Sequence, residues 1–258
     1  MKKYLNLIWV ICLAALLVFA LVANNKDYKY KELNKVRDYL YEISFDDYKQ
    51  DDKLQSLTNI EDWGCSSAKN GNFYGRNFDF IYNDVPEFVI RVNAKEGRHA
   101  SIGVGILGSV HEEDMNLEKY NKALELLPCS TLDGINDCGV ICSDNVVPRC
   151  DTAEITGTNP EGKDLHISQI VRFVLDNATS ADNAVELLNE RNIYGNIGED
   201  YNLHFMIADK DKTYVVEFID NKMVAQEKLT NEQIMTNFYV NMSQLTENAA
   251  GVERYKIL

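Results

Sequence analysis

A cysteine and an arginine flank the most informative turn of the sequence, within residues 64–80. The pair Asn70-Gly71 favours a two-residue type I′ hairpin turn, because both central residues of that turn need a positive φ. With these two residues in the turn, Cys65 lies directly opposite Arg76 on one face of the hairpin. A guanidinium beside a thiol favours the thiolate, so this register predicts a lowered pKa for Cys65 and a reactive nucleophile.

A carboxylate follows in the same strand. Asp79 lies on the face opposite to Arg76 if the strand is regular, and it reaches the Cys65 end only if the strand bulges or bends. Two ordinary alternatives stand beside the reactive site. Cys65 is then a buried and inert core thiol, and Arg76 and Asp79 form a local ion pair.

The segments that carry these residues resemble the choloylglycine hydrolase family, which includes bile salt hydrolases and penicillin V acylases and has acid ceramidase-like relatives. Five motifs occur in the family's order and cover about residues 64–258. They are Gly64-Cys65-Ser66-Ser67 with Tyr74–Phe80, Asp133–Val140, His204–Asp209 with Val215–Phe218, Met235–Phe238, and Glu253–Tyr255.

The resemblance implies an α+β fold, the four-layer αββα sandwich of N-terminal nucleophile hydrolases. In that class the nucleophile is the first residue of the mature chain, so the Gly64–Cys65 bond would have to be cut autocatalytically. Residues 24–64 then form a pro-segment, and residues 65–258 form the hydrolase domain. Family members continue well beyond the Arg-Tyr motif, so the resemblance leaves open a sandwich truncated at its C-terminus.

The resemblance also implies a role for each catalytic residue. The free α-amino group of the new N-terminus has a pKa of about 7.7–8.0 and can take the proton of its own thiol. Asp79 would orient this amine, and Arg76 and Arg254 would tune the thiolate or hold a substrate oxygen. Asn237, with Asn136 contributing a side-chain or a backbone donor, would stabilise the oxyanion.

The last three of these residues also have ordinary structural interpretations. Asn136 is equally well a turn residue in a glycine-rich bend. Asn237 is equally well a hydrogen-bonding residue at a strand edge, and Arg254 a solvated charge near the end of the sequence.

The expected activity is hydrolysis of a linear C–N amide bond through an acyl-enzyme. The substrate is a small acyl amide such as a bile salt, a penicillin V-like amide or an N-acyl amine. Two alternatives remain open: an acyltransferase on the same fold, and a surface-anchored binding protein that is never processed. No cofactor is expected.

No metal site is expected either, because the four histidines share no spacing and Cys138, Cys142 and Cys150 have no histidine nearby in the sequence. Gly103–Gly108 matches G-x-G-x-x-G, but the carboxylates that follow it disfavour a nucleotide phosphate, so a strand of small residues is the better interpretation.

The first residues predict export. After Lys2 and Lys3, residues 7–23 contain no charged side chain, which is typical of a signal peptide or a single membrane anchor. We therefore assign residues 1–23 to a cleaved signal or an uncleaved anchor that holds the rest outside the cytoplasm. Five cysteines follow this segment, which predicts one free thiol and allows two disulfides among Cys129, Cys138, Cys142 and Cys150.

The elements that must position the site follow from periodicity. Residues 30–43 have apolar side chains at helical spacing and predict an amphipathic helix within the pro-segment. Further helices are expected at residues 112–127, 165–176 and 181–191, the last with Ser180 as its N-cap. Strands are expected in residues 65–108, 134–148, 203–208, 214–219 and 222–228. This order indicates helices stacked on antiparallel sheets.

Composition sets the outer limits. Of the 258 residues 45% are hydrophobic, which is ordinary for a globular chain with a sizeable core. The 26 basic and 40 acidic side chains give a net charge of −14, which disfavours nucleic acid as a partner. The expected partner is the small-molecule substrate, and a membrane only if the N-terminal segment is uncleaved.

Overall fold

The computed structural model describes residues 29–55, 64–79, 85–107, 121–149, 154–228, 232–241 and 251–258. Its largest element is a nine-stranded sheet in the order β1-β2-β5-β6-β7-β8-β11-β12-β13. Neighbouring strands are antiparallel except β2 and β5, which are parallel. The strands are β1 (Glu32–Arg37), β2 (Leu40–Phe45), β5 (Glu87–Val92), β6 (Ser101–Ile106), β7 (Thr131–Asn136), β8 (Ile141–Pro148), β11 (Tyr201–Ala208), β12 (Thr213–Ile219) and β13 (Lys222–Glu227).

A second sheet of three strands has the order β14-β3-β4, and a two-stranded parallel pair joins β10 to β9. These strands are β3 (Ser66–Asn70), β4 (Phe73–Asn77), β14 (Glu232–Met235), β9 (Lys163–His166) and β10 (Arg191–Tyr194). The helices are α2 (Asn121–Glu125), α3 (Ile170–Asn177), α4 (Ala181–Asn189) and α5 (Val252–Ile257), with 3-10 turns at Leu127–Ser130 and Ile167–Gln169.

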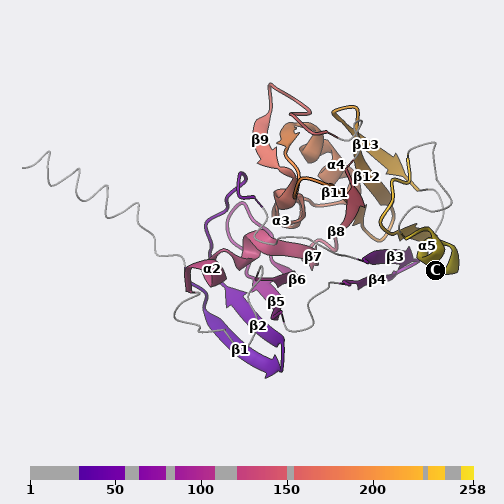
Figure 1. The fold of residues 1–258 in the computed structure, drawn as a ribbon. Helices are drawn as coiled ribbons and strands as arrows, with labels where there is room; N and C mark the ends of the chain where they lie inside the picture. The colour runs from indigo at the N-terminus through magenta and orange to yellow at the C-terminus, as the bar shows by residue number, and fades with distance from the viewer. Residues whose placement is uncertain are drawn as a thin grey trace, which may run out of the picture.

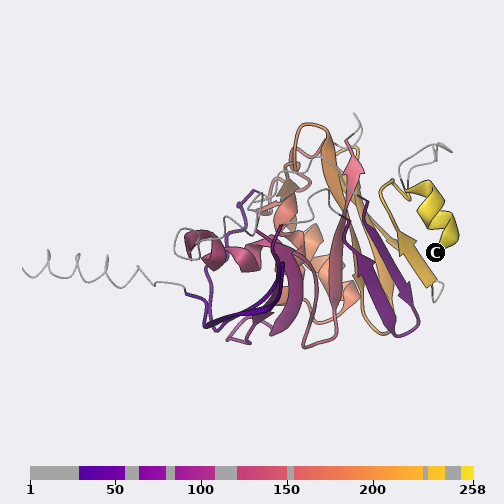
Figure 2. The ribbon, with the colours of Figure 1, turned by 60° about the horizontal axis from the view of Figure 1, so that its bottom comes forward.

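These elements stack in layers. Figures 1 and 2 show α3 and α4 on one side of the large sheet, the three-stranded sheet on its other side, and α5 beyond the small sheet. The order helix, sheet, sheet, helix confirms the expected α+β class and the αββα sandwich. Between the helices and the large sheet lies the main apolar core, which includes Phe173, Leu175, Phe205 and Phe218.

Strand β8 lies in the middle of the sandwich and is covered on both faces. Six of its residues, from Cys142 to Val147, are buried, as expected for a strand between helices and a second sheet. Polar residues of this strand face the small sheet, where the Ser67 hydroxyl lies 3.3 Å from that of Ser143 and donates to Asn145 Oδ1 over 3.2 Å. The small sheet is therefore joined to the large one through hydrogen bonds as well as apolar contacts.

The predicted amphipathic helix at residues 30–43 is wrong. These residues form β1, a turn and β2, which extend the large sheet at its edge. Tyr39 has a positive φ of 64° in the turn, and Tyr41, Ile43 and Phe45 are buried on alternate positions of β2. The apolar residues on either side of a tight hairpin turn happened to follow a helical spacing, which concealed the alternation within β2.

Most other predicted elements are confirmed among the described residues. The strands of residues 203–228 form β11 to β13, and α4 begins after Ser180, whose Oγ accepts from the backbone N–H of Asn183 over 3.1 Å. Helix α3 begins at Ile170 rather than Leu165, because Leu165 belongs to β9 and pairs with Ile193.

Part of the predicted helix 112–127 is seen as α2, and residues 112–120 lie outside the described residues. Residues 1–23, for which we predict a signal or anchor, also lie outside them. Among the residues that the structure describes, no helix is long and apolar enough to cross a bilayer.

Candidate active site

The hairpin of β3 and β4 carries the cysteine, but its register differs from the prediction. Asn70 pairs with Phe73, so the turn residues are Gly71 and Asn72 and the predicted Asn70-Gly71 turn is wrong. Gly71 alone of these two has a positive φ, 55°, which suits a turn with glycine at its first central position. Arg76 therefore pairs with Ser67 rather than with residue 65.

The new register keeps the important side chains on one face. Moving the turn by one residue shifts each pair by two, and side chains two apart on a strand share a face. Arg76 is thus a diagonal neighbour of Cys65, and its Nη2 lies 4.0 Å from the sulfur. The predicted meeting of the guanidinium and the thiol is confirmed, although the two residues are not directly opposed.

The same register explains how Asp79 reaches the cysteine. It places Asp79 opposite Gly64, and the backbone N–H of Gly64 donates to the carbonyl of Asp79 over 3.1 Å. A Cβ at Gly64 would come within 2.5 Å of the Asp79 carboxylate, so a larger residue at this position would have to displace that carboxylate. The carboxylate therefore lies against the residue that precedes Cys65, and no bulge is needed.

The Cys65 thiol is buried, with 1% of the residue exposed. Burial raises its pKa, and the Arg76 guanidinium and a backbone hydrogen bond from Asp79 only partly oppose this effect. The predicted lowering of the Cys65 pKa is therefore wrong for the uncut chain, where the thiol stays protonated at neutral pH. The hairpin register could indicate a neighbouring charge but not the depth of burial.

Arg76 is held by two carboxylates from the large sheet. Its Nη1 lies 3.0 Å from Asp133 Oδ2, and its Nη2 lies 3.1 Å from Asp144 Oδ1 and donates to the Asp144 carbonyl over 2.7 Å. Arg76 therefore does not form the local ion pair with Asp79 that was the ordinary alternative. Burial, opposed by Arg76 and assisted by the charge of Asp133, raises the pKa of Asp144 to about 7.

Arg254 comes to the same point from the opposite end of the sequence. It lies on α5, and its Nη1 donates to the Gly64 carbonyl, to the Cys65 carbonyl over 2.8 Å and to Ser66 Oγ over 3.1 Å. It is therefore not a solvated charge near the end of the sequence. Its guanidinium lies on the carbonyl oxygen of the peptide bond that joins Gly64 to Cys65.

Asn237 is buried and holds Arg254. Its Oδ1 accepts from Arg254 Nη2 over 2.7 Å, and its Nδ2 donates to the Val146 carbonyl over 2.7 Å. One of the two N–H donors of this amide is thus engaged by Val146, and the contact with Arg254 lets Asn237 orient that guanidinium, while its oxyanion role stays a prediction.

Asn136 is not brought to the cysteine. Its Nδ2 donates to the carbonyls of Leu175 and Ala178, and its Oδ1 accepts from the backbone N–H groups of Cys138 and Val140. The side chain thus joins the turn after β7 to the end of α3, on the helix side of the large sheet. The turn residue allowed as an alternative is what the structure contains, so we leave Asn136 out of the proposed site.

Two groups of supporting residues were missed from the sequence. Asp133 and Asp144 hold Arg76, as described above. Asn145 Nδ2 donates to the carbonyls of Met235 and Thr236, and the ring nitrogens of the buried His204 face the Thr236 carbonyl and Glu217. Ser143-Asp144-Asn145, a polar run within an otherwise apolar strand, was the available signal, since buried polar residues need partners.

The described cysteines form no disulfide. Cys65, Cys129, Cys138 and Cys142 are all free thiols, so the structure does not contain the two disulfides that the cysteine count allowed. Cys150 lies outside the described residues. Within the described part of the chain, one group of side chains, His99, Asp137 and Cys138, has donor atoms close enough to share a metal ion.

Comparison with known proteins places the chain in a family. Residues 66–255 match the family described as acyl-coenzyme A:6-aminopenicillanic acid acyl-transferase. This match covers most of the chain, so the protein belongs to that family. The matched region begins one residue after Cys65 and includes Arg76, Asp79, Asn237 and Arg254. No curated protein sequence matches the chain.

Solved structures with a similar course of the chain come from the enzymes that the motifs resemble. A mutant of conjugated bile acid hydrolase from Clostridium perfringens is 18% identical, with a TM-score of 0.46 over 69% of this chain and 54% of the other. Penicillin V acylase from Agrobacterium tumefaciens is 16% identical, with a TM-score of 0.40 over 73% of this chain and 49% of the other.

The chain thus spans about half the length of each of these structures. At such identities and TM-scores we base no statement about activity on them. The family assignment therefore rests on the match to residues 66–255 alone.

Proposed function

We propose that the protein is a cysteine N-terminal nucleophile enzyme that cuts its own Gly64–Cys65 bond and then cleaves a linear amide through an acyl-enzyme on Cys65. The contact of Arg254 with the Gly64 carbonyl carries this proposal. It puts a positive charge on the oxygen that would become negative when the neighbouring thiol attacks that carbonyl. The Asp79 carboxylate also lies close to Gly64.

The cleavage proceeds by an acyl shift within the chain. The Cys65 sulfur loses its proton and bonds to the Gly64 carbonyl carbon, and Arg254 stabilises the resulting oxyanion. The C–N bond then breaks, the nitrogen takes up a proton, and a thioester links Gly64 to the sulfur. Water hydrolyses the thioester, which leaves a carboxylate on Gly64 and frees both the thiol and the α-amino group of Cys65.

Turnover uses the two groups that the cleavage frees. In the uncut chain the buried Cys65 thiol keeps its proton. After cleavage the new α-amino group, with a pKa of about 7.7–8.0, can accept that proton near neutral pH. The thiolate attacks the amide carbonyl of the substrate, the amine product leaves with the proton, and water releases the acid from the acyl-enzyme. Asp79, beside the new terminus, would hold the amine in place.

Acyl transfer to an amine is a second candidate, because the description of the family names an acyl-transferase. The same acyl-enzyme serves both reactions, and the acceptor decides between them. We propose hydrolysis as the main reaction and a small amphipathic acyl amide as the substrate. The class of amide depends on the residues around the site rather than on the catalytic group.

A panel of acyl amides tests this proposal directly. It should include penicillin V, a conjugated bile salt and N-acyl amines, each assayed with and without hydroxylamine as a competing acceptor. We expect acid release in water, hydroxamate with hydroxylamine, and loss of both in Cys65→Ala. Asp211→Asn, which changes an exposed carboxylate outside the site, serves as the control and should retain turnover.

Retained turnover in Cys65→Ala would refute the cysteine mechanism. An uncut chain that turns over none of these amides would favour the alternative of a binding protein that is never processed.

A further inference from the structure

His99 and Cys138 lie close together at the protein surface, just beyond the end of β6 and β7 where Ser101 pairs with Asn136. Ser101 pairs with Asn136 at the end of these strands, and continuing that antiparallel register places His99 opposite Cys138. The chain keeps this register beyond the strands, because the backbone N–H of Asp137 donates to the carbonyl of Ala100 over 2.9 Å. Topology thus supplies the histidine neighbour that the sequence spacing around Cys138 lacks.

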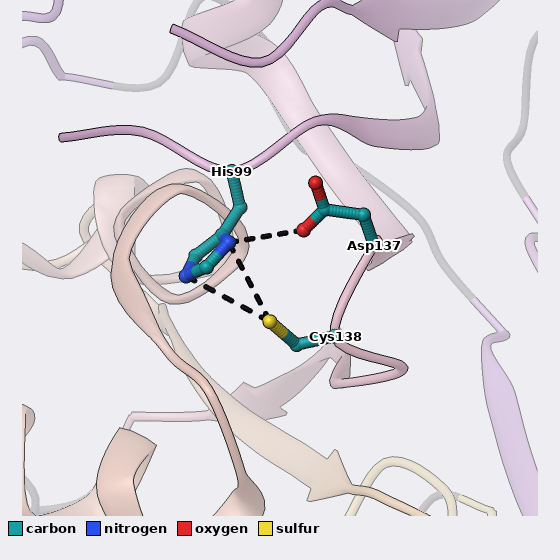
Figure 3. A group of neighbouring side chains, drawn as sticks. All are labelled: His99, Asp137 and Cys138. Carbon is teal, nitrogen blue, oxygen red and sulfur yellow. Dashed lines mark hydrogen bonds and ion pairs between the residues drawn. The ribbon is translucent and has the colours of Figure 1, made fainter. Parts of the chain in front are cut away.

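Three donor atoms converge there, as Figure 3 shows. His99 Nδ1 lies 2.9 Å from Asp137 Oδ1 and 3.5 Å from Cys138 Sγ, and all three donors lie within 4.8 Å of one another. A tetrahedral ion with bonds of about 2.3 Å to sulfur and about 2.0 Å to nitrogen has these two donors about 3.5 Å apart. The observed separation of His99 Nδ1 and Cys138 Sγ, 3.5 Å, therefore matches the separation expected of two ligands of one tetrahedral ion.

The backbone around the three side chains is fixed by hydrogen bonds. The N–H of Ala100 donates to Asp137 Oδ2 over 3.2 Å, which leaves Oδ1 directed toward the histidine. The N–H of Cys138 donates to Asn136 Oδ1 over 3.1 Å, and Gly139 completes the turn with a φ of 79°. Asn136, for which we expected a catalytic role, thus shapes the turn that presents Asp137 and Cys138.

A catalytic Cys-His-Asp arrangement fits this geometry poorly. Such a triad places the acid and the thiol on opposite nitrogens of the imidazole. Here the carboxylate and the sulfur both lie nearest to Nδ1, and Nε2 is 3.9 Å from the sulfur. A carboxylate beside a thiolate is repulsive unless a cation lies between them, so this arrangement favours a shared ion over a free nucleophile.

We propose that His99 Nδ1, Asp137 Oδ1 and Cys138 Sγ bind one divalent cation of the zinc type. Imidazole and thiolate together select Zn²⁺ and similar borderline ions over Mg²⁺ or Ca²⁺. The Sγ–metal bond replaces the S–H bond, the thiol proton passes to solvent, and the histidine carries its proton on Nε2. Three protein ligands leave a fourth position for water, so the ion is exchangeable.

Cobalt(II) is the probe, because cobalt bound to a thiolate absorbs in the near ultraviolet. The full chain, kept reduced and freed of metal, is titrated with Co²⁺ in a Cys65→Ala background that removes the proposed nucleophile. We expect one equivalent with a thiolate-to-cobalt band that Zn²⁺ displaces. Cys138→Ser should abolish the band, and His99→Gln and Asp137→Asn should each weaken binding at least about tenfold.

Asp211→Asn, an exposed carboxylate in the turn after β11, is the matched control and should leave the titration unchanged. A band that persists in Cys138→Ser, or an unmodified site that gives no band, would overturn the proposal. The titration needs neither cleavage nor turnover, so its failure is distinguishable from failure of the proposed function.

Discussion

Arg254 joins the two ends of the candidate site, since it touches the Gly64 carbonyl, Ser66 and Asn237 at once. A lysine keeps the charge but lacks the planar fork of two nitrogens with which Arg254 contacts the Gly64 carbonyl through Nη1 and Asn237 through Nη2. We expect Arg254→Lys to slow cleavage of the Gly64–Cys65 bond by about 10²–10³-fold, the usual effect of losing an oxyanion donor. A time course of processing during cell-free synthesis, read on denaturing gels, measures this rate.

Arg149→Lys is a suitable control, because Arg149 donates to the Glu199 carbonyl near the protein surface. It should process at the rate of the unchanged chain. Equal rates for Arg254→Lys and the unchanged chain would exclude Arg254 from the cleavage.

The raised pKa of Asp144 predicts that the free energy of unfolding depends on pH. Its pKa of about 7 in the folded chain is above the value of about 3.9 expected when unfolded. Between these values the folded chain binds a proton that the unfolded chain has released, so the free energy of unfolding falls as the pH rises. This contribution is at most about 1.4 kcal/mol per pH unit, and it ends once the pH exceeds the folded pKa.

Asp144→Asn removes this titrating group while Asp133 still pairs with Arg76. We expect the free energy of unfolding, measured in urea from pH 4 to pH 7, to fall less steeply with pH than in the unchanged chain. Identical slopes in the two proteins would show that Asp144 ionises at its ordinary pKa.

At the residue scale the sequence could identify the charged partners of Cys65 but not all of its surroundings. Arg76, Asp79 and Arg254 do meet around residues 64 and 65, because motif order and strand pairing bring them together. The pKa of Cys65 depends on burial between two sheets, which a hairpin register does not contain. The Asn136 side chain and its backbone N–H are bonded within the turn after β7 and to the end of α3, and a turn asparagine looks like an oxyanion donor in a sequence.

At the scale of elements, β1 and β2 make the region before Cys65 part of the large sheet. β2 pairs with β5, the N–H of His166 donates to the Asp52 carbonyl over 2.7 Å, and Gln169 Nε2 donates to the Leu54 carbonyl over 2.9 Å. Tyr48 is buried and donates to Asp176 on α3. These contacts do not depend on the Gly64–Cys65 peptide bond.

We therefore expect the segment before Cys65 to stay bound after cleavage. Native gel filtration should give one species that separates into two chains on a denaturing gel. A cleaved protein that loses its N-terminal segment under native conditions would contradict the packing described here.

Helix α4 gives a test of local stability. Ser180 accepts from the N–H of Asn183 and caps the first turn of the helix. Ser180→Ala should lower the free energy of unfolding by about 1 kcal/mol, and Ser180→Asp should retain most of it, because aspartate caps equally well. Denaturant unfolding of the three proteins checks this, and an unchanged midpoint for alanine would show that the cap contributes nothing.

The sequence predicted elements best where one pattern ran uninterrupted. The antiparallel strands β11 to β13 and the cap of α4 follow from alternation and from a serine before a helical period. The helix predicted over residues 30–43 is wrong because a tight turn interrupts the strand pattern at Tyr39. The predicted start of α3 at Leu165 is wrong because Leu165 lies in β9, which pairs in parallel with β10. Local periodicity does not show this long-range contact.

At the scale of the whole molecule, the candidate site lies where the two sheets and α5 meet. Cys65 directly precedes β3 of the small sheet, and Arg76 lies on β4 of the same sheet. Asp133 and Asp144 come from the large sheet, and Arg254 comes from α5. No local segment contains all of them, so from the sequence only the order of the motifs could predict that these residues lie close together. The layered fold brings the separate segments together to form the site.

The most direct test of this account is the N-terminus of the processed chain. Intact-mass analysis with N-terminal sequencing of the purified protein should find a chain that begins at Cys65, and Cys65→Ala should remain joined across residues 64 and 65. A fully folded protein in which Gly64 and Cys65 stay joined would contradict the central claim, because its thiol would remain buried, protonated and without an α-amino group to activate it.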